Sequence, residues 1–243
     1  MKKKILITGS SGFIGKNIVS YLSKKNEIIA ACWKLNKKKK RNIKFIRYTK
    51  KNLDKLSGID AIVHCAASTP PKYSQEDCYK NNKIIDNLAI SFAESKKIKI
   101  FIYLSSMSVY GKNKNLIVKE KNSPKNIDLY GLSKFESEKK LLKISKKKIQ
   151  SILILRLSSI LGRGSHSTFL SNLKNSFLKK KFIKINNKDS FFNGCLHIND
   201  LNFFIEKILG TYKKSYDFIN IASYKPIKLE KIINFFKKNI KKD

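Results

Sequence analysis

The sequence lacks the features of disulfide scaffolds and of membrane proteins. Its cysteines form neither a Cys-x-x-Cys pair nor a dense pattern, which is typical of a reducing compartment; they are Cys32, Cys65, Cys78 and Cys195. No apolar run approaches the roughly 20 residues of a membrane helix. The basic start "MKKK" is followed only by "ILI", which is too short for the apolar core of a signal peptide. We therefore expect a cytoplasmic protein that does not bind membranes.

Acidic residues and arginine are scarce beside lysine. Lysine and arginine number 53 against 17 aspartates and glutamates, a formal net charge of +36, and the arginines are Arg41, Arg47, Arg156 and Arg163. A basic chain can bind nucleic acid, but bidentate recognition of phosphates and bases uses arginine. The lysines are spread along the chain beside abundant asparagine and isoleucine, a composition that A/T-rich codons produce without a selected partner. We expect no specific nucleic-acid partner, only a positive field that favours anionic ligands.

Short apolar, β-branched runs alternate with segments of helical length. The predicted strands are 4–8, 27–32, 43–47, 61–66, 98–105 and 151–157, and the predicted helices between them are 13–25, 76–96 and 129–147. Alternation of helices with almost continuously apolar strands predicts an α/β fold, in which a parallel sheet is covered on both faces.

The pattern changes after residue 157. A polar loop, "SSILGRGSHS", leads into a helix near 168–180, a helix from Asp200, a strand at 216–221 and a last helix from Leu229. We place a boundary near residue 160, between a first domain of residues 1–160 and a shorter region of residues 161–243 packed on it.

The first strand runs directly into "GSSGFIG", and an apolar-periodic helix follows. Gly9 can adopt a backbone conformation that other residues resist, Gly12 lets a pyrophosphate approach, and Gly15 lets the helix pack on the strand. The helix N-terminus then offers free N–H groups and a partial positive charge to phosphates. The strand, turn and helix together predict a dinucleotide-binding site.

The glycine spacing is Gly-x-x-Gly-x-x-Gly, and further motifs follow it in order. They are "DAIVHCAA" (60–67), "NNKIIDNL" (81–88), "YLSSMSVYG" (103–111), "YGLSKFESE" (130–138), "LRLSSILGRG" (155–164) and "CLHINDL" (195–201). With these motifs the chain resembles the extended short-chain dehydrogenase/reductase family, the NAD(P)-dependent nucleotide-sugar epimerases, dehydratases and reductases. The resemblance covers roughly residues 4 to 235. It implies a Rossmann-type doubly wound sheet that binds NAD(P) and a small, trimmed substrate-binding part.

A tyrosine followed four residues later by a lysine occurs at Tyr21, Tyr79, Tyr110, Tyr130 and Tyr224. Only Tyr130 opens a helix that follows the "SSMSVYG" loop. Tyr130 and Lys134 share one face of that helix. Because an ammonium beside a phenol stabilises the phenolate, we expect the pKa of Tyr130 to fall below its usual value of about 10.

The resemblance implies a role for each residue of this group. Tyr130 is the general acid/base, Lys134 lowers its pKa and holds the nicotinamide ribose, and Ser106 hydrogen-bonds the reacting oxygen. The implied cofactor-binding residues are Gly9, Ser11, Gly12, Phe13, Ile14, Gly15, Trp33, Lys34, Ala66, Ala67, Asn81, Tyr130 and Lys134.

The chain departs from the family pattern at the end of the second strand. An NAD site has an acidic residue there for the adenosine ribose, whereas this chain has Cys32, Trp33 and Lys34. The positive charge suits a 2′-phosphate, so NADP(H) is favoured over NAD(H).

Two further departures concern the reaction and the substrate. The dehydratases of the family carry an Asp-Glu pair after the catalytic serine or threonine, and this chain has Met107-Ser108, so dehydration is discounted. The arginine that often precedes the late motif is replaced by Asn193, so the family's substrate contacts are not transferred.

Other polar residues of these motifs have structural interpretations. With three histidines in the chain, His64 is expected to pack behind the cofactor and no metal site is predicted. Asn81 either hydrogen-bonds near the site or caps a turn. His197 and Asp200 are expected to be structural, and Glu138 to be a partner on its own helix face.

The resemblance thus implies an enzyme that transfers hydride at a carbon of a nucleotide-activated sugar. A 4-ketoreductase and a 4-epimerase both remain open, and a homodimer is common in the family. The alternative is a non-catalytic module in which a nucleotide-binding fold is recruited to RNA or to an assembly.

Overall fold

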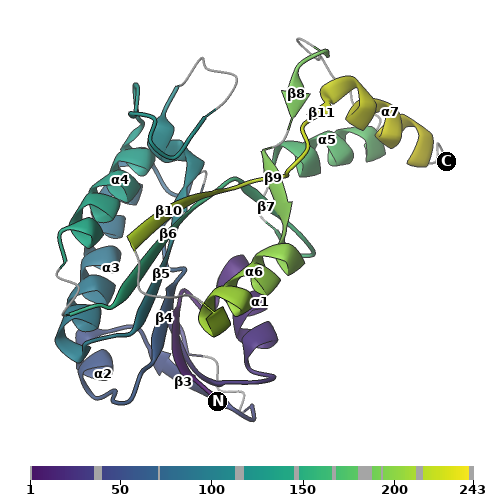
Figure 1. The fold of residues 1–243 in the computed structure, drawn as a ribbon. Coiled ribbons are helices and arrows are strands. Elements are labelled where there is room, and N and C mark those ends of the chain that lie inside the picture. Colours follow the sequence, from purple (N-terminus) through teal and green to yellow (C-terminus); the bar gives the residue numbers. More distant parts are fainter. Residues whose placement is uncertain are drawn as a thin grey trace.

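The computed structural model of the chain describes residues 2–35, 40–70, 72–112, 118–144, 148–165, 168–179, 188–192, 194–211 and 216–240. Seven parallel strands form one sheet in the order β10-β6-β5-β4-β1-β2-β3 (Figure 1). They are β1 (Lys4–Thr8), β2 (Glu27–Cys32), β3 (Ile43–Arg47), β4 (Ala61–His64), β5 (Ile100–Ser106), β6 (Ser151–Leu157) and β10 (Tyr216–Ile221). The predicted doubly wound parallel sheet is confirmed.

Helices cover both faces of the sheet. One face packs against α1 (Phe13–Leu22) and α6 (Ile198–Thr211), and the other against α2 (Lys50–Asp54), α3 (Gln75–Lys96) and α4 (Leu129–Leu142) (Figure 1). Side chains alternate along each strand: Ile5 and Ile7 of β1 lie in the first core and Leu6 in the second. Because both faces are buried, the strands are apolar at almost every position.

The sequence placed five strands correctly and missed several short elements. β1, β2, β3, β6 and β10 have the predicted bounds. β4 ends at His64, because the N–H groups of Cys65 and Ala66 donate to the hydroxyl of Thr8. The helix α2, the 3₁₀ turn η1 (Met107–Tyr110) and four short strands were not predicted; these strands are β7 (Ser159–Leu161), β8 (Phe191–Phe192), β9 (Cys195–His197) and β11 (Ile227–Lys228).

Two predicted helices are shorter than expected. α1 ends at Leu22 rather than at residue 25, where the N–H of Ser23 caps the helix on the carbonyl of Val19. α4 ends at Leu142 instead of 147, and residues 145–147 of the prediction lie outside the described residues.

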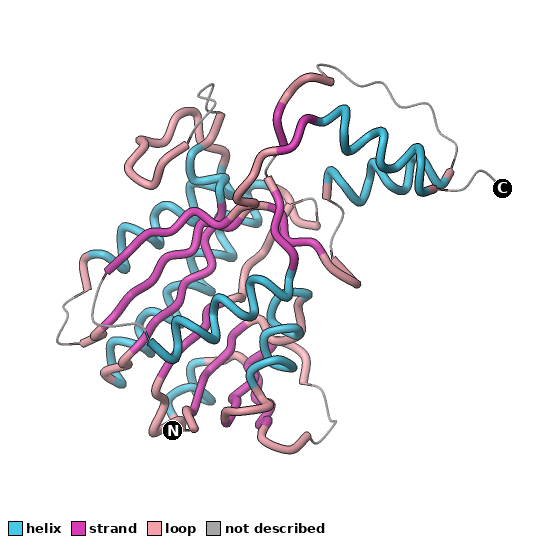
Figure 2. The backbone as a smooth tube through the Cα atoms, turned by 45° about the vertical axis from the view of Figure 1, so that its right-hand side comes forward, coloured by secondary structure: helices cyan, strands magenta, loops and turns pink. Residues whose placement is uncertain are grey.

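The segment after residue 160 contributes to two parts of the molecule. Its β10 adds to the edge of the main sheet and its α6 packs on α1, whereas α5 (Phe169–Leu178), α7 (Leu229–Asn239) and the β8–β11 pair lie away from the sheet (Figures 1 and 2). The boundary near residue 160 stays a prediction. No helix of the described residues is both long and apolar enough to cross a membrane.

Candidate active site

Two cavities meet at the carboxyl ends of the central strands. The smaller one, of about 250 Å³, follows the glycine turn; we call it the glycine cavity. The larger one, of about 1350 Å³, opens between the 3₁₀ turn after β5 and the segment that carries β8; we call it the outer cavity. Thr69, Ser106, Tyr130, Leu157 and Ser158 line both. Ligands of open parallel sheets bind at this edge of the sheet.

The glycine turn has the backbone conformation and the close packing that the sequence predicted for Gly9 and Gly15. Gly9 has φ +63, and a Cβ there would lie 2.7 Å from Cα of Ala66. A Cβ at Gly15 would lie 2.2 Å from the carbonyl oxygen of Gly9. The fold therefore requires glycine at both positions. Gly12 differs, because the nearest atom to its added Cβ is that same oxygen at 3.3 Å.

The glycine cavity has backbone N–H donors and lining residues that suit a dinucleotide cofactor. Gly12 immediately precedes α1, so the unpaired N–H groups of the first helical turn are available to an anion. Of the predicted cofactor-binding residues, the cavity is lined by Gly9, Gly12, Phe13, Ile14, Gly15, Ala67, Tyr130 and Lys134. A side chain at Gly12 would project into the space where the sequence predicts that phosphates approach the backbone.

The other predicted cofactor residues lie outside the glycine cavity. Ala66 packs against the backbone of Gly9, and Ser11 is exposed in the turn. Trp33 and Lys34 are exposed just after β2, where the Trp33 ring meets Tyr48 edge-on at 6.1 Å between centroids. Asn81 is partly buried on α3 and lines neither cavity.

Gly12→Ala is expected to weaken cofactor binding without unfolding the protein. Gly12 has φ −74, which alanine adopts, and its added methyl group meets no protein atom closer than 3.3 Å. The methyl group would face the cofactor, so we expect the Kd for NADPH to rise at least about tenfold, which corresponds to about 1.4 kcal/mol. Fluorescence titration measures the Kd and thermal denaturation the stability. Gly210→Ala, on α6 with nothing within 4 Å, is the control and should change neither markedly; an unchanged Kd in Gly12→Ala would contradict the phosphate site.

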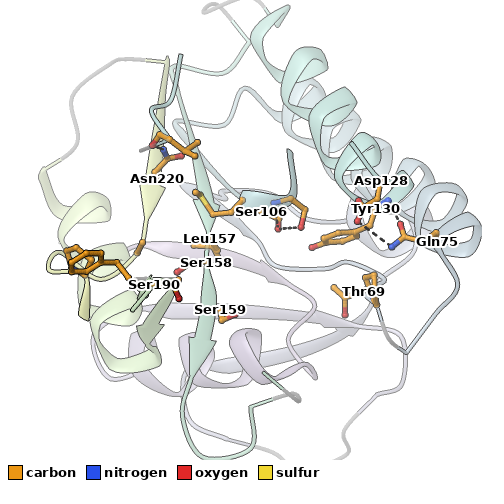
Figure 3. A pocket seen from close by; sticks show the side chains of 18 of the residues that line it. Thr69, Gln75, Ser106, Asp128, Tyr130, Leu157, Ser158, Ser159, Ser190 and Asn220 are labelled. Atoms are coloured by element: carbon orange, nitrogen blue, oxygen red, sulfur yellow. Dashed lines mark hydrogen bonds between the residues drawn. The ribbon is translucent and has the colours of Figure 1, made fainter. Parts of the chain in front are cut away.

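The structure brings Ser106, Tyr130 and Lys134 together from two elements. Ser106 ends β5, and its hydroxyl donates to the hydroxyl of Ser108 at 3.1 Å. Tyr130 lies in the first turn of α4, with its ring directed toward Ser106 (Figure 3). Lys134 is one turn further along α4 and lines the glycine cavity.

The start of α4 is held in place by caps and by a close contact. The carboxylate of Asp128 accepts from the N–H of Gly131 at 2.7 Å, and the side-chain oxygen of Gln75 accepts from the N–H of Tyr130 at 2.8 Å. A Cβ at Gly131 would lie 2.3 Å from the carbonyl oxygen of Ser108. Glycine at this position therefore lets α4 approach the loop that carries Ser106, which positions the phenol of Tyr130.

The electrostatics of Tyr130 differ from the sequence-based expectation. Its ring is partly exposed because it faces both cavities, but desolvation raises the pKa of Tyr130 to about 12, and the hydroxyl of Ser106 offsets only part of this rise. The predicted fall in this pKa is wrong for the free chain. Nζ of Lys134 instead donates to the hydroxyl of Tyr103 at 3.1 Å and lies 3.7 Å from Asp86.

Sequence reasoning missed Asn82, the neighbour of Asn81. Asn82 is fully buried; its Oδ1 accepts from the N–H of Ser68 at 2.7 Å and its Nδ2 donates to Oγ of Ser133 at 3.1 Å. It thus ties the loop after β4 to the turn between Tyr130 and Lys134. Two adjacent asparagines on a helix face in different directions, so only the packing of α3 distinguishes them.

The partner that the sequence predicted for Glu138 is wrong. Instead of a partner on its own helix face, Glu138 is buried and accepts from Nη2 of Arg156 on β6 at 2.6 Å and from Nε at 3.0 Å. The hydroxyl of Ser105 donates to the same carboxylate at 2.6 Å. The pair therefore joins α4, β5 and β6 directly behind Ser106.

The remaining polar residues of the motifs have the following positions. His64 is buried between Thr8 and Asp86, and the described residues hold no group of three or more metal-ligating side chains. His197 is exposed, its Nδ1 accepting from the N–H of Asn199 at 3.2 Å. Asp200 is exposed in the first turn of α6. Asn193 lies outside the described residues.

Comparisons with known proteins identify the family of the chain. The family model "NAD dependent epimerase/dehydratase family" matches residues 5–222. An ADP-L-glycero-D-manno-heptose-6-epimerase of Brachyspira hyodysenteriae is 30% identical over 233 residues, covering 83% of this chain and 72% of the relative. A UDP-glucose 4-epimerase of Vibrio cholerae is 30% identical over 190 residues, covering 72% of this chain and 57% of the relative.

A solved structure supports the same assignment. The UDP-glucuronic acid 4-epimerase from Bacillus cereus, in complex with NAD, superimposes with a TM-score of 0.81 at 25% sequence identity, covering 97% of this chain and 82% of that chain. The resemblance stated from the motifs is confirmed by the family model, which spans most of the chain. The chain belongs to the NAD-dependent epimerase/dehydratase family.

Proposed function

We propose that the chain is an NAD(P)-dependent oxidoreductase or epimerase of a nucleotide-activated sugar, with hydride transfer at a sugar carbon. The observation that carries the proposal is the place of Tyr130, which lines both the glycine cavity and the outer cavity. A phenol at that junction can reach a substrate in one cavity and a cofactor in the other. When bound, the nicotinamide accepts or delivers the hydride.

Tyr130 supplies the proton in this mechanism. Because its pKa is raised to about 12, the phenol is protonated at neutral pH and can donate to a sugar oxygen that gains negative charge. The hydroxyl of Ser106 can hydrogen-bond the same oxygen. Met107 and Ser108 stand where a dehydratase needs an acid and a base, which disfavours elimination of water.

The outer cavity suits the sugar part of such a substrate. Its lining includes the uncharged polar side chains of Thr69, Gln75, Ser108, Ser159 and Asn220, together with the carboxylates of Asp128 and Asp189. Figure 3 labels several of these residues around the cavity. Hydroxyl and amide groups can both donate and accept, so they match the hydroxyls of a sugar.

We favour NADP(H) over NAD(H) as the cofactor. Cys32 is buried at the end of β2 and its Sγ donates to the carbonyl oxygen of Lys34. The sequence has no aspartate or glutamate among residues 32–41. Lys34 is exposed there and can approach a 2′-phosphate. The solved epimerase from Bacillus cereus contains NAD, and its similarity to this chain supports NAD(H) instead.

A 4-ketoreductase and a 4-epimerase are both consistent with this site. The missing ribose acid and the protonated phenol favour reduction, whereas the named relatives are epimerases. The test is to identify any nicotinamide that co-purifies and then to screen nucleotide-sugars and 4-keto sugars with both cofactors. Stoichiometric consumption of NADPH indicates a reductase, and turnover without net redox an epimerase. No turnover together with tight, sequence-dependent RNA binding at physiological salt would favour the non-catalytic alternative.

A homodimer through α3 and α4 is part of the same proposal. The two helices pack side by side, and Ile84 and Leu142 on them are 66% and 42% exposed. Analytical ultracentrifugation of the wild type and of Ile84→Glu tests the homodimer: we expect a dimeric mass for the wild type and a monomeric mass for the variant. A monomeric mass for both would contradict the proposed homodimer.

A further inference from the structure

A cluster of polar side chains is buried behind Tyr130, between the sheet and helices α3 and α4. We call it the Asp86 cluster; its members are His64, Asp86, Tyr103, Lys134 and Ser137, each at most 7% exposed. Only Lys134 of these five reaches the glycine cavity. Buried polar groups of this kind are costly unless every one has a partner.

The carboxylate of Asp86 is the centre of the cluster. Its Oδ1 accepts from Nε2 of His64 at 2.8 Å, and its Oδ2 accepts from the hydroxyls of Tyr103 at 2.5 Å and Ser137 at 2.8 Å. Nζ of Lys134 lies 3.7 Å from the same Oδ2. Three elements thus converge on one carboxylate, because His64 is on β4, Tyr103 on β5, and both Lys134 and Ser137 on α4.

Thr8 determines which nitrogen of His64 carries the proton. Its Oγ1 accepts from the N–H groups of Cys65 and Ala66, both at 3.2 Å, and lies 2.8 Å from Nδ1 of His64. The hydroxyl proton of Thr8 therefore goes to Nδ1, which leaves the ring proton on Nε2 for Asp86. Burial lowers the pKa of His64, so the ring is neutral and acts as a hydrogen-bond donor. His64, at the end of β4, thereby holds the carboxylate of Asp86, and Ala66, two residues further along, packs against Gly9.

Lys134 supplies the only positive charge of the cluster. Burial alone would raise the pKa of Asp86, but the charge of Lys134 and the hydrogen bond from His64 outweigh it and lower this pKa to about 2. Nζ of Lys134 also donates to the hydroxyl of Tyr103 at 3.1 Å and lies 4.6 Å from the centre of its ring. An ammonium has three N–H donors. With one used by Tyr103 and one directed to Asp86, a third remains for the glycine cavity.

We propose that Asp86 is a positioning residue, which together with Tyr103 holds the ammonium of Lys134 in one place so that its free donor faces the glycine cavity. This proposal rests on the proposed function, in which Lys134 contacts the cofactor. A neutral residue at position 86 would leave the ammonium free to turn away, and a misplacement of about 1 Å at a catalytic group can cost about 100-fold in rate.

The direct test follows the ammonium of Lys134 by NMR. Among the described residues Lys134 is the only buried lysine, so its NH₃⁺ protons should exchange slowly enough for detection at neutral pH while those of exposed lysines are lost. Lys134→Met assigns the signal. We expect Asp86→Asn to abolish it, and to lower kcat about 100-fold with a circular dichroism spectrum like that of the wild type.

Asp77→Asn is the matched control. It makes the same chemical change on the same helix, but Asp77 is exposed in the first turn of α3. It should keep the signal and a kcat within about twofold of the wild type, as expected for a surface change.

A second variant covers the case in which Asp86→Asn does not fold. Tyr103→Phe keeps the ring and removes only the hydroxyl that accepts from Lys134, and we expect faster ammonium exchange and a lower kcat. An unchanged ammonium signal and unchanged kcat in the folded variants would overturn the proposal. If the signal depends on Asp86 but no nucleotide-sugar is turned over by the wild type, the positioning stands and the proposed function fails.

Discussion

Tyr130→Phe is expected to lower kcat by about 10²–10⁴-fold, the usual contribution of a general acid or base. The variant keeps the ring that lines both cavities and removes only the proton-donating hydroxyl. Lys134, the glycine turn and the first turn of α1 are untouched, so the Kd for the nicotinamide cofactor should stay within about twofold of the wild type. Steady-state kinetics and cofactor titration on the same preparation separate the two quantities.

The matched control for this prediction is Tyr79→Phe. Tyr79 also has a lysine four residues later, and its hydroxyl donates to the carboxylate of Glu136 at 3.0 Å, but it lines neither cavity. It should keep nearly all activity. Turnover of Tyr130→Phe at the rate of the wild type would refute the catalytic assignment, because no other phenol of the described residues lies at the junction of the cavities.

Glu138→Gln is expected to destabilise the fold by about 3–5 kcal/mol, the cost of leaving one charge of a buried pair without its partner. The guanidinium of Arg156 and the carboxylate of Glu138 are 5% and 1% exposed and are joined by two hydrogen bonds. Since single domains are stable by about 5–15 kcal/mol, such a loss would be a large part of the total. Urea denaturation monitored by circular dichroism measures it.

Asp54→Asn provides the surface comparison. Asp54 pairs with Lys50 at 2.7 Å, and Nη2 of Arg156 lies at the similar distance of 2.6 Å from Glu138. The side chains of Asp54 and Lys50, however, are 51% and 79% exposed. Water screens this pair, so the loss should stay below about 1 kcal/mol. If Asp54→Asn and Glu138→Gln lowered the free energy of unfolding equally, burial would not determine the contribution of the Arg156–Glu138 ion pair to stability.

Much of the fold could be predicted because the information is local. The strand β1, the glycine turn and α1 follow one another within 22 residues, and the apolar runs show which strands are buried on both faces. The turn residue Gly9 was correctly interpreted because a positive φ has a clear residue preference. The short pairs β7–β9 and β8–β11 could not be predicted, since strands of two or three residues have no periodicity of their own.

In the candidate site, too, some features follow from the local sequence and others only from the tertiary structure. The sequence by itself determined the parallel α/β fold, the glycine turn and the order in which Ser106, Tyr130 and Lys134 follow it. Only the tertiary structure decided where Lys134 points and which charges lie behind Tyr130, because Asp86 on α3 and Lys134 on α4 are separated in the chain by β5 and η1. The pKa of a buried group depends on its desolvation and on partners a few ångströms away in space. Those partners come from β4, β5 and α3, and no local pattern identifies them before the sheet and its helices pack together.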